Sequence, residues 1–486
     1  MNRPIIWLLS ILAASATLAW ASDAPAPKRF SVEDVRSDFR ELYERLQASH
    51  FDLYARRPKS DYDALFQSTL AGLDRPLTEV EIQASFQRFM AFGRVAHSRI
   101  DFPYDAYEAY RQGGGRSMPL TVRIVQGRVY ILDNNSGVAA LTPGAEIVGL
   151  NGQPIATWLT RLAADISADN DYMMETILER RWSSLLWLEL GEVAQFALTV
   201  RTPHGEETVA VPARTRAEIK AASDAQNQTL SLDWDKREFR MVGGVGYLRP
   251  GPFYNNDPKA TNIWDAALFR QFIDDAFGKL LQANAKSLVI DLRDNPGGDN
   301  SFSDTMVAWF ATKPFRFASA FKIKVSAAAI ESNRKRLAVP PQELDPISQK
   351  LAAAYAAHRI GDVFSFEIPE ALPRPGTRFA GKVYLLINRH SYSNTVQVAA
   401  LAQDNRFATI LGEETSDLAT TYGAMEQFTL SRTGTLVGFP KAMIIRANGN
   451  LAPRGVVPDI AIPTPIVEDR TDPVLSHALE IAGGKP

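Results

Sequence analysis

Two stretches that each join an apolar strand pattern to a polar turn and a helix pattern constrain the fold more than any other feature. The first runs from residues 288–293 into a turn at 294–298, and the second runs from 383–387 into a turn at 388–394. Apolar strands that alternate with helices are typical of a parallel sheet covered on both faces. Because this alternation recurs through the C-terminal half, we expect an α/β domain over residues 232–470.

The region before this domain shows two other patterns. Residues 28–113 carry apolar side chains at helical spacing, with an N-cap at Ser31 and a capping box that opens at Thr78, and predict a small helical domain. Residues 117–215 consist of short alternating runs broken by turn residues and predict a compact β-rich domain. A polar segment at 216–231 reads as a linker. The expected fold is therefore multidomain, with α+β and α/β parts.

The N-terminus has the order of a secretory signal. Arg3 precedes an apolar run from Ile5 to Trp20, which ends in the small-residue pattern Ala19-Trp20-Ala21. This order predicts a signal peptide over 1–21 with cleavage after Ala21. A membrane anchor is the less favoured alternative, since the run is shorter than the ~20 residues that span a bilayer. We expect an exported protein, with no membrane insertion after signal cleavage and a bacterial periplasm as its compartment.

The charge and the cysteine count exclude several classes of function. Lys and Arg together number 53 and Asp and Glu together number 55, which gives a net charge of −2. The chain therefore lacks the excess of basic residues that is typical of nucleic-acid-binding proteins. The chain has no cysteine, so disulfides, thiolate metal sites and a cysteine nucleophile are excluded together. No set of His, Asp and Glu has metal-ligand spacing, and we expect neither a metal nor another cofactor. The sequence makes no prediction of the oligomeric state.

The two strand-ending turns hold the residues that carry chemistry. Gly297 and Gly298 allow the backbone to approach a ligand and to direct N–H groups at a developing oxyanion, although a simple left-handed turn would also need glycine. Ser393 lies on the second turn just before a helix, where a hydroxyl is exposed at the sheet edge and the N–H of Asn394 follows it. The alternative is that Ser391 or Ser393 only caps this helix.

Taken in order, these segments resemble the S41 peptidase family, which includes the C-terminal processing proteases and the tricorn-like proteases. The resemblance rests on the segments around 291–298, 385–404 and 410–415 and on the ending at 455–463, and it covers nearly all of the mature chain. It implies a ClpP/crotonase-like protease core. The stretch LTPGAEIVGLNGQPI resembles the signature of PDZ domains, which bind extended peptides by β-addition.

The resemblance assigns roles to the turn residues. Ser393 falls at the place of the family's nucleophile, Asn394 supplies the following N–H, and Gly297 and Gly298 fall where the second oxyanion donor lies. Processing proteases activate the serine with a lysine, and Leu418 occupies that place here. Tricorn-like members use a histidine from the region before the PDZ-like domain, which makes His97 the candidate general base and places the chain closer to that branch.

Two features of the expected site stay open. His390 lies three residues before Ser393 and is a rival base. The acid of tricorn-like members would fall near Ala452, where no carboxylate stands, so Glu426, Asp459 or solvent are the alternatives for the orienting group.

We therefore expect a secreted serine endopeptidase that hydrolyses peptides or unfolded proteins through Ser393 and His97. The alternative, from a different class, is a catalytically inactive S41-like protein that binds peptides. A hydrolase acting on a non-peptide ester and a transport-type use of the same fold are the remaining readings.

Overall fold

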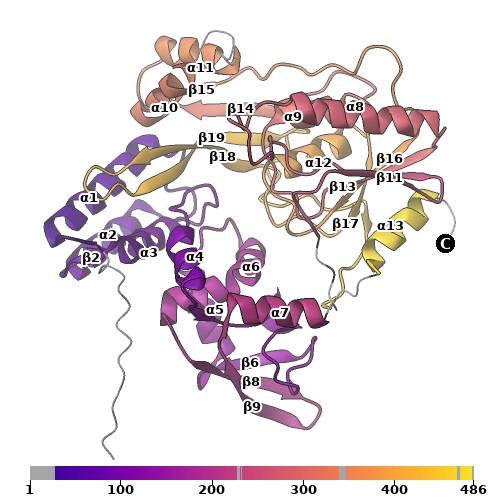
Figure 1. Cartoon of the computed structure of the whole chain (residues 1–486). Coiled ribbons are helices and arrows are strands. Elements are labelled where there is room, and N and C mark those ends of the chain that lie inside the picture. The colour runs from indigo at the N-terminus through magenta and orange to yellow at the C-terminus, as the bar shows by residue number, and fades with distance from the viewer. Residues whose placement is uncertain (1–27, 227–229, 231, 339–345, 468–470, 484–486) are drawn as a thin grey trace, which may run out of the picture.

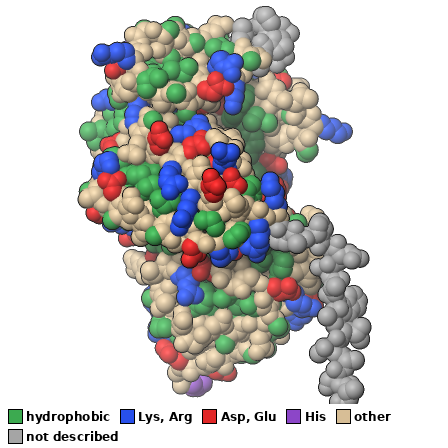
Figure 2. Space-filling model, turned by 90° about the vertical axis from the view of Figure 1, so that its left-hand side faces the viewer, with side chains coloured by type: hydrophobic (Ala, Val, Ile, Leu, Met, Phe, Trp, Pro, Cys, Tyr) green, Lys and Arg blue, Asp and Glu red, His purple; other side chains and the backbone are tan. Residues whose placement is uncertain are grey.

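The computed structural model describes residues 28–226, 230, 232–338, 346–467 and 471–483, and it is a mixed α and β protein with several sheets (Figure 1). The predicted signal peptide over 1–21 lies outside the described residues. In the part of the chain that the structure describes, no helix is both long and apolar enough to cross a membrane. Hydrophobic, basic and acidic side chains are intermixed on the face drawn in Figure 2, in keeping with the near-zero net charge.

The N-terminal part is built from helices, as predicted. Its elements are β1 (Arg29–Phe30), α1 (Val32–Ser49), α2 (Lys59–Gly72), β2 (Leu77–Thr78), α3 (Glu79–Ala91) and α4 (Tyr104–Gln112). Ser31 caps α1 by accepting the N–H of Asp34, and the capping box at Thr78 is present. Because α3 ends at Ala91, His97 lies in the loop between α3 and α4 and not on a helix.

The next part combines a sheet with two helices. The strands follow the order β4-β5-β6-β8-β9, with β7 paired to β6, and a small separate pair joins β3 to β10. The elements are β3 (Arg116–Ser117), β4 (Leu120–Val125), β5 (Arg128–Asn134), β6 (Glu146–Leu150), β7 (Gln153–Pro154), α5 (Ile155–Ala163), α6 (Asp171–Leu190), β8 (Gln195–Thr202), β9 (Gly205–Pro212) and β10 (Arg214–Thr215). The long helix α6 packs against β4 and is the main element that the β-rich prediction does not contain.

The predicted linker is wrong for most of its length, because residues 216–226 form helix α7 (Arg216–Gln226). The backbone N–H of Thr215 donates to the carboxylate of Glu218, and the N–H of Glu218 donates to the hydroxyl of Thr215. This reciprocal pair is a capping box, which satisfies two N–H groups that the first turn of a helix leaves free.

The C-terminal part contains the predicted α/β sheet. Its strand order is β11-β12-β13-β16-β17-β20; the pair β11–β12 is antiparallel and the remaining pairs are parallel. The elements are β11 (Glu238–Val242), β12 (Val245–Arg249), α8 (Ala267–Gln282), β13 (Ser287–Asp291), α9 (Asn300–Val307), β16 (Lys382–Ile387), α12 (Asn394–Asp404), β17 (Thr409–Gly412), β20 (Ile460–Ala461) and α13 (Pro473–Gly483).

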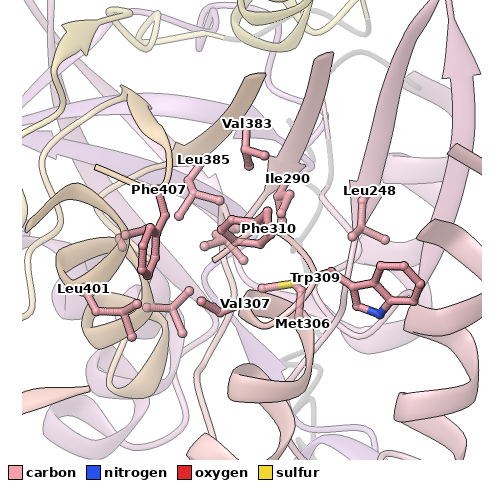
Figure 3. Close-up of a cluster of buried hydrophobic side chains, with 14 of the residues drawn as sticks. Leu248, Ile290, Met306, Val307, Trp309, Phe310, Val383, Leu385, Leu401 and Phe407 are labelled. Atoms are coloured by element: carbon pink, nitrogen blue, oxygen red, sulfur yellow. The ribbon is translucent and has the colours of Figure 1, made fainter. Parts of the chain in front are cut away.

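Helices cover both faces of this sheet, which explains the continuous apolar strands. Leu385 of β16 points to the core formed with α8, α9 and α12 (Figure 3), whereas its neighbour Leu386 points to the core formed with α13. Successive side chains of a strand alternate between faces, so a strand covered on both sides is apolar throughout. The carboxyl ends of β13 and β16 thereby place their two turns side by side, since these strands are parallel neighbours.

A second, antiparallel sheet with the order β15-β14-β19-β18 joins the core to the N-terminal helices. Its elements, with two helices above them, are β14 (Ala318–Lys324), α10 (Ala327–Leu337), α11 (Pro346–Ala357), β15 (Val363–Ser365), β18 (Thr421–Thr429) and β19 (Leu436–Arg446). Phe428 and Phe439 from the hairpin of β18 and β19 are buried in the same core as α1 and α3. Arg99 pairs with Gly438 of β19 by two backbone hydrogen bonds, and this contact holds the His97 loop against the hairpin.

Candidate active site

Ser393 has a backbone conformation that few residues other than glycine adopt. It lies between β16 and α12 with φ +56° and ψ −123°, and its side chain makes no capping hydrogen bond to α12. Such a conformation costs about 1–3 kcal/mol and persists only where the surroundings impose it. A strained turn from strand to helix presents a serine hydroxyl at the edge of the sheet, as a nucleophile requires.

Ser391 has a structural role instead. Its buried hydroxyl donates to the carbonyl oxygen of Leu292 at 2.8 Å and accepts the backbone N–H of Asn388 at 3.1 Å. These bonds tie the turn after β16 to the turn after β13. Of the two serines, Ser391 therefore holds the turn and Ser393 has its hydroxyl available.

Gly297 and Gly298 lie against the serine turn and can only be glycine there. A Cβ on Gly297 (φ +90°) would lie 2.8 Å from the amide nitrogen of Asn394 and 3.0 Å from the Cβ of Ser393. A Cβ on Gly298 (φ +139°) would lie 2.1 Å from the carbonyl oxygen of Phe253. The missing side chains thus allow the two predicted turns to come into contact, which a lone left-handed turn would not require.

Two backbone N–H groups at this contact donate to no other group of the described residues. They are those of Gly298 and Asn394, whereas the N–H of Gly297 donates to the side chain of Asn295 at 2.9 Å. The amide side chain of Asn394 is held by Ser303 at 2.9 Å. One N–H from each turn therefore has the capacity to bind an oxyanion.

His97 is brought close to the serine turn although the chain separates them by almost 300 residues. Its ring stacks on that of Tyr392, with the centroids 5.7 Å apart and the planes at 22°. Burial, aided by the positive charge of Arg99, lowers the pKa of His97 to about 4, and the carbonyl of Tyr422 opposes this shift. The imidazole is therefore neutral at pH 7 and able to accept a proton. Within the described residues, no hydrogen bond joins it to Ser393, and its buried Nδ1 has no partner.

The rival base His390 has a different neighbour. Its Nε2 lies 2.7 Å from Oε1 of Glu179, a buried residue of α6. Arg389 also contacts Glu179, at 3.4 Å, and Glu413, at 2.9 Å. His390 thus belongs to a polar network that links the turn after β16 to α6.

The two candidate acids of the sequence are held elsewhere. Glu426 of β18 pairs with the buried Lys441 at 2.5 Å and with Arg336 at 2.7 Å. Asp459 accepts the backbone N–H of Ile410 at 2.8 Å and the side chain of Gln403, and so fixes the start of β17. Neither carboxylate hydrogen-bonds to Ser393 or His97.

The structure brings another carboxylate, Asp417, to the serine. Its Oδ2 accepts the backbone N–H of Ser393 at 2.6 Å, and its Oδ1 accepts that of Leu418 at 2.9 Å. Burial, together with the nearby charge of Asp169, raises the pKa of Asp417 to about 7. Sequence reasoning missed it, although Asp417 directly precedes Leu418, the residue at the place of the family's lysine.

Comparisons with known proteins connect the region that contains both turns to a peptidase family. Residues 245–462 match the model of peptidase family S41, so this region of the chain, which contains both turns, belongs to that family, as its motifs predicted.

Two solved structures of mature CPAF share the fold over most of the chain. One, in complex with lactacystin, has a TM-score of 0.64 at 16% identity and covers 93% of this chain and 98% of the other. The second has a TM-score of 0.63 at 16% identity and covers 93% and 97%. The photosystem II D1 C-terminal processing protease is a weaker match, with a TM-score of 0.45, 15% identity and coverage of 92% and 97%. No curated protein matches the chain significantly.

Proposed function

We propose that this protein is an exported serine endopeptidase of the tricorn-like type, with Ser393 as nucleophile and His97 as general base. The observation that carries the proposal is the strained conformation of Ser393 against Gly297, with one N–H of each turn left available. Strain of this kind is retained where function needs it, because an ordinary helix cap would be satisfied by a relaxed serine.

The arrangement supports a two-step hydrolysis. Oγ of Ser393 attacks the carbonyl carbon of a peptide bond while its proton passes to His97, and the former carbonyl electron pair becomes an oxyanion bound by the N–H groups of Gly298 and Asn394. Collapse of this intermediate breaks the C–N bond, and the amine leaves with the proton from His97. A water molecule then attacks the acyl-enzyme in the same way and releases the acid and Ser393.

His97 must move to reach the hydroxyl of Ser393 in the first step. In the unbound protein its ring stacks on Tyr392 and forms no hydrogen bond with Ser393. Hydrogen bonds between base and nucleophile are often loose before substrate binds and tighten in the complex. The sheet of β4–β9, which we propose to be PDZ-like, would supply a binding edge for an extended peptide or an unfolded protein.

A fluorophosphonate probe tests the proposal directly, because it reacts only with an activated serine. We expect the mature protein to be labelled, Ser393→Ala to lose the label, and Ser301→Ala, an exposed serine on the neighbouring helix α9, to keep it. Both variants should keep the thermal midpoint of the parent.

A folded parent that takes up no label would contradict the proposal. It would favour the alternative, a catalytically inactive peptide-binding protein, for which the missing hydrogen bond between His97 and Ser393 is the supporting observation. Export has its own test: the protein recovered from the periplasm should begin at Ser22, and a membrane-bound form that retains residues 1–21 would contradict the predicted cleavage.

A further inference from the structure

The loop that carries Asp417 is fixed by hydrogen bonds of its neighbouring residues. The hydroxyl of Thr415 donates to the carbonyl oxygen of Asp417 at 2.9 Å and accepts the N–H of Val456 at 2.9 Å. The hydroxyl of Ser416 donates to the carbonyl of Arg389. Asp417 is 1% exposed, so its carboxylate is buried in a rigid frame with the Ser393 N–H as one of its two donors.

A second buried carboxylate, Asp169, faces Asp417 from the loop before α6. One of its oxygens pairs with Arg56 at 3.0 Å, and the carboxylate lies near the backbone N–H of Ala96, the residue before His97. Its other oxygen, Oδ2, is buried and has no hydrogen-bond partner in the described part of the chain. Asp169 therefore lies near the His97 loop. Its negative charge also acts on Asp417 and raises the pKa of that residue.

The remaining charged and titratable groups around Asp417 and Asp169 come from the His97 loop, the serine turn and strand β18. Arg99 of the His97 loop and Tyr392 of the serine turn both face Asp417, and Tyr422 of β18 faces Asp169. Arg94 faces Asp169 from the start of the His97 loop. Together with Arg56, which pairs with Asp169, the two carboxylates thus lie among three cations, two phenols and the stacked imidazole.

We propose that Asp417 is a positioning residue of the nucleophile, whose charged carboxylate holds Ser393 in its strained conformation and whose charge is coupled to that of Asp169, which lies against the loop that carries His97. The proposal rests on the proposed function, because it concerns how the same serine is made reactive.

Asp417 can hold Ser393 in this way only when charged, because ionisation decides how many hydrogen-bond acceptors its carboxyl group has. A charged carboxylate accepts the N–H groups of Ser393 and Leu418 together, whereas a protonated one presents an O–H where one acceptor was. Hydrogen bonds to a charged group are the stronger kind, so protonation weakens the restraint on a turn that would otherwise relax. Since the pKa of Asp417 is about 7 and that of His97 about 4, reactivity should fall on acidification near pH 7, well before His97 is protonated.

The experiment measures the rate of fluorophosphonate labelling between pH 5 and 9 for the full mature chain and three variants. In Asp417→Asn we expect a loss of about 10- to 100-fold at pH 8, the range for a lost hydrogen bond to a charged group, and no acid limb near pH 7. In Asp169→Asn the acid limb should move to lower pH, because the charge that raises the pKa of Asp417 is removed. The control is Asp38→Asn, since Asp38 is equally buried and also accepts two backbone N–H groups, those of Arg432 and Thr433, far from the serine; its limb should stay in place.

The outcomes separate this inference from the proposed function. If the folded parent takes up no label, both the proposed function and the positioning role of Asp417 are contradicted. A parent labelled at Ser393, together with an Asp417→Asn variant that keeps the parent's rate and acid limb, overturns the positioning role alone. Should Asp417→Asn fail to fold, Asp169→Asn decides: a limb displaced to lower pH supports the coupling, and an unchanged limb overturns it.

Discussion

Replacing Gly297 by alanine would place a methyl carbon 2.6 Å from the carbonyl oxygen of Tyr392, 2.8 Å from the amide nitrogen of Asn394 and 3.0 Å from the Cβ of Ser393. All three atoms belong to the serine turn, and none is the far end of a flexible side chain. The backbone of one turn must therefore move by a few tenths of an ångström or more. A displacement approaching 1 Å at a reactive group costs about 100-fold in rate, so we expect labelling of Ser393 to fall by about that factor.

The Gly297→Ala substitution should lower the unfolding free energy in two ways, through its backbone conformation and through its contact with the serine turn. A control variant separates the two effects. Alanine at φ +90° costs about 1–2 kcal/mol for the left-handed backbone alone. Gly376 also has a positive φ, +78°, and nothing lies within 4 Å of a Cβ placed there. Gly376→Ala therefore reports the backbone cost without the contact, and any excess loss of unfolding free energy in Gly297→Ala measures the collision with the serine turn.

The assay is the rate of fluorophosphonate labelling, with urea unfolding measured on the same samples. We expect Gly376→Ala to label as fast as the parent and Gly297→Ala to label about 100-fold more slowly. If Gly297→Ala kept the parent's rate, the close approach of the two turns would have no part in reactivity, and the argument from the missing Cβ would fail.

Two further substitutions test the assignment of base and acid. His97→Ala should slow labelling by about 10²- to 10⁴-fold, the range for loss of a general base, whereas His390→Ala should change it little; equal losses in the two variants would point to His390. Glu426→Gln should lower the unfolding free energy by about 3–5 kcal/mol in a denaturant titration, because it leaves the buried Lys441 without its charged partner, yet leave the labelling rate unchanged; a loss of labelling without a loss of stability would restore Glu426 as the orienting acid.

The sheet and the serine turn could be predicted from the sequence because their signals are local. An apolar strand, a glycine or serine turn and a helix pattern follow one another within about twenty residues at 285–305 and 383–404. The capping boxes at Thr78 and Thr215 have equally local signals, and only the first of them was recognised. Helix α7 was therefore missed not for lack of a signal but because its polar composition favoured a linker.

The surroundings of the serine could not be predicted, since they depend on contacts between distant segments. Asp417 accepts a hydrogen bond from Ser393 only because β16 and β17 are neighbours in the sheet. Asp169 comes close to Asp417 from another part of the chain. In the sequence both are unremarkable aspartates without a motif. Burial also moves the pKa of His97 to about 4, away from the value of about 6.5 that is usual for a histidine.

The hairpin of β18 and β19 holds the loop of His97, the proposed base, against the serine turn. Its far end, with Phe428 and Phe439, is buried among the N-terminal helices, while Tyr422 near its start places a carbonyl against His97. The hairpin also pairs with Arg99. One hairpin thus contacts both His97 and Arg99, and it holds their loop where the imidazole stacks on Tyr392 of the serine turn.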